Sequence, residues 1–305
     1  MIQIPVKKSL MEIKSLVRIF KMIRVKLKLY FPLIKSLQTL LLVFSGVAGY
    51  MSARPDNSDF ILFASLCGSL FLTISGSTIL NMYFDRDLDS RMGRTKKRPL
   101  PSGKVKPLEV LIFGMIFSSA GLIWSVTLSF KYCLILLAGL LIDVLVYTMW
   151  LKRKTPWSII WGGISGGMPI LAGRVLGIGS IDGIGILFAF AILLWIPTHI
   201  MTFSMNYYED YHKAGIPTFP SVYGFKHTRL IISLSSVGAA LSIGIGFLIL
   251  GLSIGYIRLL AILTVGFFGI VIFGMLKPSR VINNGLFKYA SLYMMISLIM
   301  IIVGT

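Results

Sequence analysis

Charged residues are scarce in this sequence, and acidic residues are the scarcest of them. Only 13% of the 305 residues are charged and 11 are acidic, whereas 56% are hydrophobic and the mean hydropathy is +0.85. Such a composition excludes a soluble globular protein, because too little polar surface is available to face water. We therefore expect an integral membrane protein of the all-α class, with the lipid bilayer as its surroundings.

Cysteine is almost absent as well. The two cysteines, Cys67 and Cys133, lie in apolar runs and show no recognisable ligand spacing. Neither a disulfide framework nor a cysteine metal site is indicated. Both side chains are expected in the protein core or against lipid.

Long apolar runs, by contrast, are abundant. A hydrocarbon core of roughly 30 Å needs about 20 apolar residues per helix. Nine runs of this kind cover residues 34–53, 59–80, 107–128, 131–150, 157–178, 183–205, 229–250, 254–276 and 286–304. The sequence thus predicts one domain over residues 34–305, in which nine transmembrane helices surround a central cavity.

Residues 1–33 form a basic segment ahead of the first run. A mitochondrial transit peptide is one interpretation, but the segment contains Glu12 and leads directly into the first apolar run. We favour an amphipathic helix that lies at the membrane interface.

The basic residues are distributed unevenly between alternate loops. The net charge of +19 could suggest nucleic acid as a partner, but 26 of the 30 Lys and Arg residues fall on one side of the predicted topology. This is the positive-inside pattern. It predicts a multi-pass protein of the cell membrane with a cytoplasmic N-terminus, an external C-terminus and no nucleic-acid partner; the mitochondrial inner membrane is the alternative.

The second apolar run ends in an acidic stripe. Asn81, Asp85 and Asp89 are spaced i, i+4, i+8, so on a helix their oxygens project from one face. Oxygen ligands without His or Cys suit Mg²⁺, which also takes ligands from substrate phosphates. The alternative is a solvated helix end. Asp87 points off the stripe, and we expect it to pair with a nearby arginine such as Arg86 or Arg91.

Basic residues on the same predicted face of the membrane as the stripe are candidate diphosphate ligands, because guanidinium and ammonium groups pair with phosphate oxygens. Each could instead be an ordinary positive-inside residue. The candidates are Arg94, Arg98, Lys152, Arg153 and Lys213.

The first motif has an echo later in the chain. Asn81-x-Tyr83-x-Asp85 reappears as Asn206-x-Tyr208-x-Asp210, again at the end of an apolar run and on the same predicted side of the membrane. Such a parallel repeat predicts two cytoplasmic half-sites that face each other across the cavity. Asn206 and Asp210 would then bind the diphosphate from the second half-site.

Three polar residues lie within or near apolar runs. His199 is seven residues before Asn206 and shares a face with it, so it either contacts substrate or is a buried hydrogen-bonded histidine. Asp143 and Arg174 differ in predicted depth, and we do not expect them to pair. The glycines at 162, 163, 166 and 167, followed by Pro169, predict close helix packing.

Several blocks together resemble a known family. Asn81-xxx-Asp85-xxx-Asp89, followed by Arg94-Thr-x-x-Arg98-Pro-Leu-Pro-Ser-Gly, is similar to the first motif of the UbiA-type intramembrane prenyltransferases. The blocks that begin at Tyr147 and Asp210 are most similar to the haem O synthase branch. The resemblance spans about residues 30–300, although Asp143 and Arg174 replace residues usually apolar or aromatic there.

The resemblance implies a reaction. A prenyl group, farnesyl or longer, would pass from its diphosphate to the 2-vinyl group of protohaem IX (haem B), with Mg²⁺ as cofactor, and a downstream haem-modifying enzyme is a possible partner. It implies that Asn81, Asp85 and Asp89 hold the metal, and His199 is a candidate for contacting the porphyrin or ordering water. Two alternatives remain: a UbiA-type enzyme with an aromatic or lipid acceptor, and a transporter, whose sites should lie nearer the membrane midplane.

Overall fold

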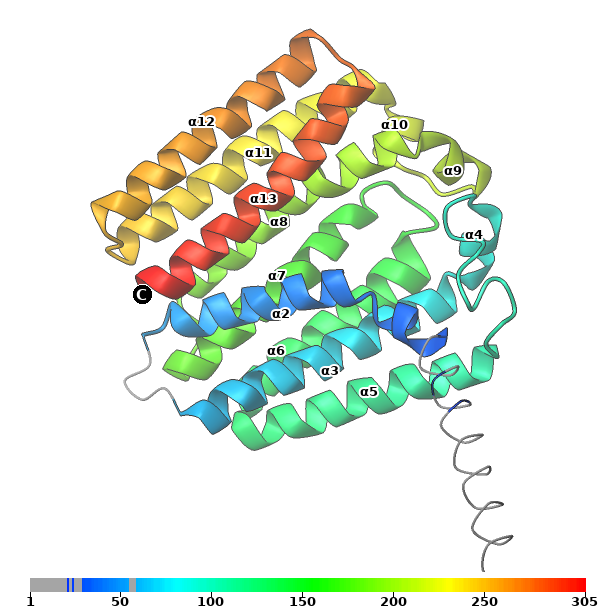
Figure 1. The fold of residues 1–305 in the computed structure, drawn as a ribbon, viewed down its shortest axis with the longest axis horizontal. Coiled ribbons are helices and arrows are strands. Elements are labelled where there is room, and N and C mark those ends of the chain that lie inside the picture. Colours follow the sequence, from blue (N-terminus) through cyan, green and yellow to red (C-terminus); the bar gives the residue numbers. More distant parts are fainter. Residues whose placement is uncertain (1–20, 22–23, 25–28, 55–58) are drawn as a thin grey trace, which may run out of the picture.

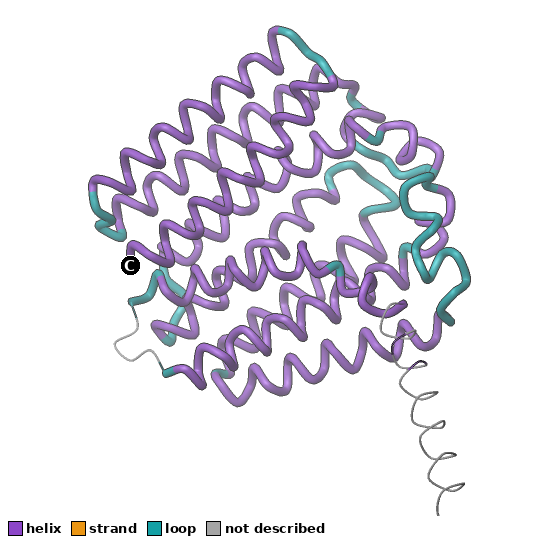
Figure 2. Tube along the Cα trace, in the orientation of Figure 1, coloured by secondary structure: helices purple, strands orange, loops and turns teal. Residues whose placement is uncertain are grey.

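The computed structural model describes residues 21, 24, 29–54 and 59–305, and this part of the chain contains helices and no strands (Figures 1 and 2). The prediction for residues 1–33 therefore lies largely outside the described residues. The elements are η1 (Phe31–Ile34), α2 (Ser36–Met51), α3 (Phe60–Phe84), α4 (Arg86–Arg91), α5 (Pro107–Leu128), α6 (Phe130–Leu141), the π-helical η2 (Ile142–Leu151), α7 (Ser158–Ile178), α8 (Gly183–Asn206), α9 (Tyr208–Lys213), α10 (Phe219–Val222), α11 (Gly224–Ile249), α12 (Ile254–Leu276) and α13 (Arg280–Gly304).

Eight helices in the described part are long and apolar enough to cross a membrane, with α6 and η2 counted as one span. The chain is a multi-pass membrane protein. The first expected span corresponds to α2, which has 16 residues and is shorter than the roughly 20 that a bilayer requires. The count of nine spans therefore stays a prediction, although α2 packs inside the bundle against α3 and α7.

The long helices run side by side, with α7 central to their packing. It contacts α2, α6 and α8, while α3 packs on α5, and α8 also contacts α11 and α13. The short helices α4, α9 and α10 gather at one end of the bundle, on the right of Figure 1. The polar connections that the sequence places after α3 and α8 thus lie at the same end.

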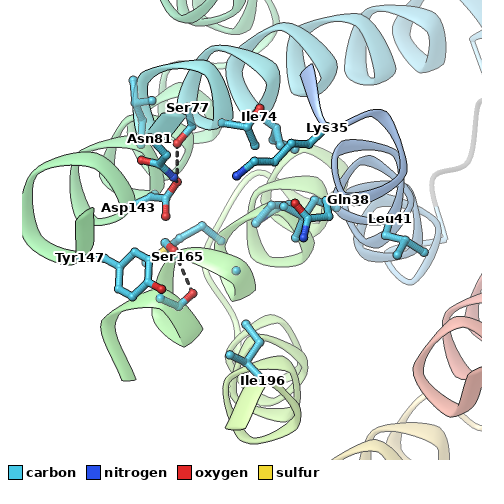
Figure 3. Close-up of a pocket in the computed structure, with 18 of the residues that line it drawn as sticks. Lys35, Gln38, Leu41, Ile74, Ser77, Asn81, Asp143, Tyr147, Ser165 and Ile196 are labelled. Carbon is cyan, nitrogen blue, oxygen red and sulfur yellow. Dashed lines mark hydrogen bonds between the residues drawn. The ribbon is translucent and has the colours of Figure 1, made fainter. Parts of the chain in front are cut away.

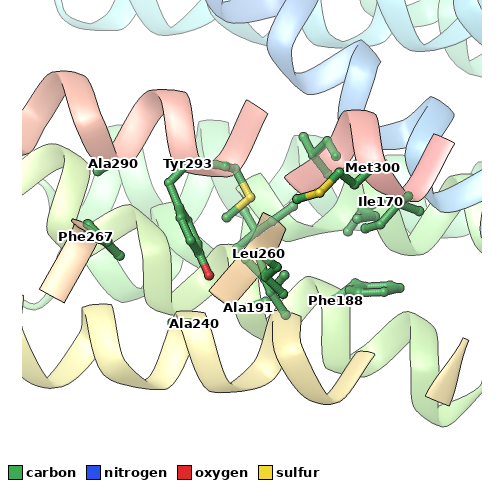
Figure 4. Close-up of a cluster of buried hydrophobic side chains, with 14 of the residues drawn as sticks. Ile170, Phe188, Ala191, Ala240, Leu260, Phe267, Ala290, Tyr293 and Met300 are labelled. Atoms are coloured by element: carbon green, nitrogen blue, oxygen red, sulfur yellow. The ribbon is translucent and has the colours of Figure 1, made fainter. Parts of the chain in front are cut away.

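The largest buried cluster joins α7, α8, α11, α12 and α13. Phe188, Phe247, Phe267 and Tyr293 are almost completely buried there, and three of them are labelled in Figure 4. Large apolar side chains on the outer faces, such as Leu276 of α12, are exposed, as expected for surfaces that contact lipid. This cluster and the outer faces of the bundle are therefore both largely apolar.

Glycines allow the central helices to approach closely. A Cβ atom built on Gly173 of α7 would collide with the backbone carbonyl oxygen of Gly46 in α2, and one on Gly167 would lie 2.7 Å from the carbonyl oxygen of Ala189 in α8. Helices can meet at this distance only where no side chain intervenes. The close packing predicted for the glycines before Pro169 is confirmed at Gly163, Gly166 and Gly167, whereas a Cβ on Gly162 would make only ordinary contact with the Tyr147 ring.

We expect Gly173→Ala to destabilise the protein by about 1–3 kcal/mol, because the added methyl group must push two backbones apart. Gly244→Ala in α11 is the matched control, since nothing lies within 4 Å of a Cβ at that position. Thermal unfolding in detergent measures both variants. Equal melting temperatures for the two would show that the α2–α7 contact is not tight.

Candidate active site

A cavity of about 300 Å³ lies between α2, α3, α6 with η2, α7 and α8 (Figure 3). Its walls are largely apolar, with Leu136, Leu140, Met168 and Ile196 among them. Polar residues of the lining come from five elements and one linker. They include Lys35, Gln38, Thr73, Ser77, Thr78, Asn81, Asp143, Tyr147, Ser165 and His199. The predicted central cavity is present, and it contains Asn81 and His199 together.

The acidic stripe is not one uninterrupted helix. Helix α3 ends at Phe84 and α4 begins at Arg86, with Asp85 between them at φ −89° and ψ 2°. Nevertheless the amide of Asp85 donates to Asn81 O at 2.9 Å, and the amide of Asp89 donates to Asp85 O at 2.8 Å. Because both i to i+4 hydrogen bonds are present across the break, Asn81, Asp85 and Asp89 keep nearly the spacing that one continuous helix would give them.

Two buried carboxylates of the stripe are paired with cations. The Nζ atom of Lys152 lies 2.5 Å from Oδ2 of Asp85, and Nη1 of Arg98 lies 3.0 Å from Oδ2 of Asp89. Burial by itself would lower the pKa of Lys152, but the Asp85 carboxylate outweighs it and raises that pKa, so the ammonium stays charged. The sequence placed Arg98 shortly after the stripe and Lys152 on the same predicted face of the membrane, and the structure brings both into direct contact with the stripe.

One oxygen of the stripe is left without a partner. Oδ1 of Asp85 is buried and has no hydrogen-bond partner among the described residues. A buried carboxylate oxygen normally has one, so an unpaired atom of this kind calls for an explanation. The described residues contain no group of three or more His, Cys, Asp or Glu side chains that could hold a metal ion, so a cation here would also need the Asn81 amide or substrate oxygens.

The predicted partner of Asp87 is wrong. Arg153, and not Arg86 or Arg91, binds the Asp87 carboxylate through two N–H groups, both at 2.7 Å, and also donates to the carbonyl oxygen of Phe84. Arg86 instead lies over the Tyr83 ring. Local spacing misled here because Arg153 arrives from a distant loop. Its guanidinium is thereby engaged at the surface, away from the stripe.

The second motif touches the first through Asp210. This carboxylate accepts hydrogen bonds from the backbone amides of Gly93 at 3.1 Å and Arg94 at 3.3 Å. The Arg94 guanidinium lies over the ring of Phe203 on α8, at 4.9 Å, and over the ring of Tyr207 just after α8, at 5.4 Å. Residues of the two loops also share a small buried cluster that contains Leu88, Met92, Ala214 and Ile216. Asp85 and Asp210 are 125 residues apart in the sequence, yet the two motifs to which they belong lie in contact in the fold.

Asn206 and Lys213, the two further candidate ligands of the second motif, have different surroundings. Asn206 donates to Asn284 and accepts from Asn283, both on α13, so its carboxamide is held between α8 and α13. Lys213 is exposed at the end of α9. Nothing in the sequence linked the Asn283-Asn284 pair to the second motif, because no spacing rule connects residues this far apart.

His199 is enclosed by aromatic rings. It stacks between Trp195 at 4.8 Å and Phe287 at 4.4 Å, and its Nδ1 lies 3.0 Å from the Ser291 hydroxyl. This histidine is hydrogen-bonded and also lines the cavity. Both interpretations offered by the sequence are therefore compatible with its position.

Asp143 and Arg174 do not pair, as expected. Arg174 lies at the far end of α7, where it binds Asp182 at 2.7 Å and the carbonyl oxygen of Ser52, and so ties three helix ends together. Asp143 accepts from Ser77 and Asn81 in the cavity wall. The Thr148 hydroxyl donates to the oxygen of the same Asn81 carboxamide. No sequence pattern had pointed to Ser77 or Thr148 as part of the site.

The fold and this site define a class of protein. A model of the UbiA prenyltransferase family matches residues 42–297, and the chain belongs to that family. It is a membrane-embedded prenyltransferase.

Two relatives are similar to this chain over most of its length. The chain is 36% identical over 270 residues to the protoheme IX farnesyltransferase of Archaeoglobus fulgidus, covering 88% of this chain and 94% of that protein. It is 41% identical over 221 residues to the protoheme IX farnesyltransferase of Korarchaeum cryptofilum, covering 72% and 74%.

Solved structures share the fold. A digeranylgeranylglyceryl phosphate synthase matches with a TM-score of 0.76 at 24% identity, over 92% of this chain and 98% of that one. A UbiA homologue from Archaeoglobus fulgidus, bound to DMAPP and Mg²⁺, matches with a TM-score of 0.66 at 16% identity, over 91% and 100%.

We expect Asp87→Asn to cost at most about 1 kcal/mol at pH 7, because its ion pair with Arg153 is partly exposed. Hydrogen bonds from Arg153 lower the pKa of Asp87 to about 2, so the pair stabilises the fold above about pH 4 and this contribution is lost as pH falls toward 2. Melting temperatures of the wild type and the variant should therefore converge on acidification. A gap that widens at low pH would contradict the assignment.

Proposed function

We propose that this prenyltransferase transfers a farnesyl or longer prenyl group from its diphosphate to the 2-vinyl group of protohaem IX, in a Mg²⁺-dependent reaction. The names of its relatives support the haem acceptor and the farnesyl donor. The observation that carries the proposal is structural. Asn81 lines a largely apolar cavity, and Asp85 and Asp89, each paired with a cation, follow it along the chain. Among the described residues, Oδ1 of Asp85 has no hydrogen-bond partner.

The residues fit a magnesium site. Asn81, Asp85 and Asp89 would supply amide and carboxylate oxygens, the ligand type that Mg²⁺ prefers, and the unpaired Oδ1 of Asp85 would gain a partner. When bound, Mg²⁺ supplies positive charge that stabilises the departing diphosphate. The second half-site contains two acids, Glu209 and Asp210. The Asp210 carboxylate already accepts hydrogen bonds from the backbone amides of Gly93 and Arg94, and we assign neither acid as a metal ligand.

Cations at the same place would bind the diphosphate. Lys152 and Arg98 each have one carboxylate partner and further N–H groups to offer, so they can contact phosphate oxygens while remaining beside Asp85 and Asp89. Arg94 would add a third charge, held in place by its stacking on α8. Asn206, Lys213 and Arg153 stay candidates for weaker contacts, because each lies at the periphery of this group or is engaged elsewhere.

The cavity would protect the reactive intermediate. As the bond between prenyl C1 and the diphosphate oxygen breaks, an allylic cation forms, and the apolar walls of α6, α7 and α8 keep water from capturing it. The vinyl carbon of haem then attacks C1, and the resulting cation takes up water and loses a proton. His199, between Trp195 and Phe287, would contact the flat porphyrin or order that water.

The proposal also places the protein in the cell. The one-sided distribution of Lys and Arg supports a cytoplasmic N-terminus in the cell membrane, with the diphosphate entering from the cytoplasm. Residues 1–33 would anchor the domain at that surface. A hydroxyalkylated haem is a membrane-bound product, so an enzyme that modifies haem further would consume it.

Mass spectrometry of haems extracted from membranes that contain the protein tests the acceptor. We expect a haem heavier than haem B by one prenyl unit plus water. Unmodified haem B, with folded protein and prenyl diphosphate present, would overturn the haem assignment and favour an aromatic or lipid acceptor.

Paired variants test the metal site. We expect Asp85→Asn to lower turnover by about 100-fold or more, since it removes charge where the leaving group is stabilised. Asp87→Asn, the same change two residues away at the surface, should keep most of the activity. Equal activity of the two variants at saturating Mg²⁺ would contradict the assignment of Asp85.

Kinetic assays with the two substrates test the role of His199. We expect His199→Ala to raise KM for haem by several-fold while KM for the prenyl diphosphate changes little, because the histidine stacks between aromatic rings and hydrogen-bonds Ser291 rather than the cations that would hold the diphosphate. Steady-state kinetics with each substrate varied in turn would check this. An effect confined to the prenyl diphosphate would show that His199 serves the donor.

A further inference from the structure

The carboxamide of Asn81 is held at both ends by one neighbouring segment. Its Nδ2 donates to Oδ2 of Asp143 at 2.7 Å, and its Oδ1 accepts from the Thr148 hydroxyl at 2.9 Å. Both partners lie on η2, the π-helical part of the fourth long helix (Figure 3 shows the contact with Asp143). The side chain at the start of the acidic stripe is therefore fixed from outside the stripe.

The π-helical turn explains how two residues five apart reach the same side chain. In an α-helix, residues i and i+5 point in different directions, whereas the wider π turn hydrogen-bonds residue i+5 to residue i and aligns them more closely. Asp143 and Thr148 have this spacing within Ile142–Leu151. π-helical turns are often found at functional sites, and this one faces the cavity.

The charge of Asp143 determines which way the amide points. A carboxylate can only accept hydrogen bonds, so the group of Asn81 that faces it must be the NH₂. Ser77, one turn before Asn81 on α3, donates to the same Oδ2 at 2.5 Å. Turning the amide over would place its oxygen against the carboxylate and leave two polar groups poorly paired, which is costly in a buried setting.

We propose that Asp143 and Thr148 are positioning residues that lock the Asn81 carboxamide in one orientation for metal binding. The inference rests on the proposed function, in which Asn81 Oδ1 is a Mg²⁺ ligand. That oxygen has two lone pairs, of which the Thr148 hydroxyl occupies one and leaves the other free. Partners that orient a metal ligand in this way typically change metal affinity or activity 10-fold to 100-fold when removed.

The test is Mn²⁺ binding to the purified protein, measured by electron paramagnetic resonance with a non-hydrolysable farnesyl thiolodiphosphate present. We expect Asp143→Leu, which keeps the size but removes the acceptor, to weaken Mn²⁺ binding by about 10-fold or more. Thr148→Val should weaken it less, because Asp143 still selects the orientation. Asp143→Asn, whose amide oxygen can still accept from Asn81, should restore part of the loss.

Ser165→Ala is the matched control. Ser165 lines the same cavity, but within the described part of the chain its hydroxyl bonds the carbonyl oxygen of Gly162 and not Asn81, so Mn²⁺ binding should not change. Wild-type Mn²⁺ affinity in both Asp143→Leu and Thr148→Val would overturn the proposal. Asp143→Asn replaces Asp143→Leu if the latter does not fold. In that case, Mn²⁺ affinity equal to that of the wild type in both Thr148→Val and Asp143→Asn overturns the proposal.

A further variant separates this inference from the proposed function. Asn81→Ala should abolish or strongly weaken Mn²⁺ binding if Asn81 is a ligand. Undiminished binding in Asn81→Ala would refute the ligand assignment itself. Weakened binding there, with wild-type binding in the Asp143 and Thr148 variants, would refute only the positioning role.

Discussion

The pairing of two buried carboxylates with two cations is the interaction on which the site depends. Lys152 reaches Asp85 from the loop after η2, and Arg98 reaches Asp89 from the loop after α4, so each pair ties a loop to the acidic stripe. Removing one member of such a pair leaves a buried charge uncompensated, which costs roughly 3–5 kcal/mol. The polar end of the bundle is therefore both charged and constrained.

The rest of the fold positions and isolates this charge. Glycine contacts bring α2, α7 and α8 together around a cavity whose walls are mostly apolar, and Asp210 ties the second polar loop to the first. Under the proposed function, a prenyl diphosphate and a divalent cation would bring opposite charges to this end of the bundle. The cations already present would gain phosphate oxygens and the carboxylates would gain a metal, so each charged group would keep a partner of opposite sign.

Local patterns predicted most of the fold and part of the site. Hydropathy located the long helices, because a segment in lipid must satisfy its backbone hydrogen bonds within itself and therefore forms a long apolar helix. The i to i+4 spacing placed Asp85 and Asp89 one helical turn apart. Contacts between distant segments were not predictable. Arg153 replaces the local arginines as the partner of Asp87, and Asn283 and Asn284 take the carboxamide of Asn206. The π-helical turn of η2 has no signature in composition, so the pairing of Asp143 and Thr148 with Asn81 could be seen only in three dimensions.

The most direct measurement is an experimental structure of the protein with a farnesyl thiolodiphosphate and Mn²⁺, in which anomalous scattering locates the metal. We expect the metal between the oxygens of Asn81, Asp85 and Asp89, with the diphosphate against Lys152 and Arg98 and the prenyl chain in the apolar cavity. A metal bound at Glu209 or Asp210 alone, or a prenyl chain outside the cavity, would contradict the assignment of this site.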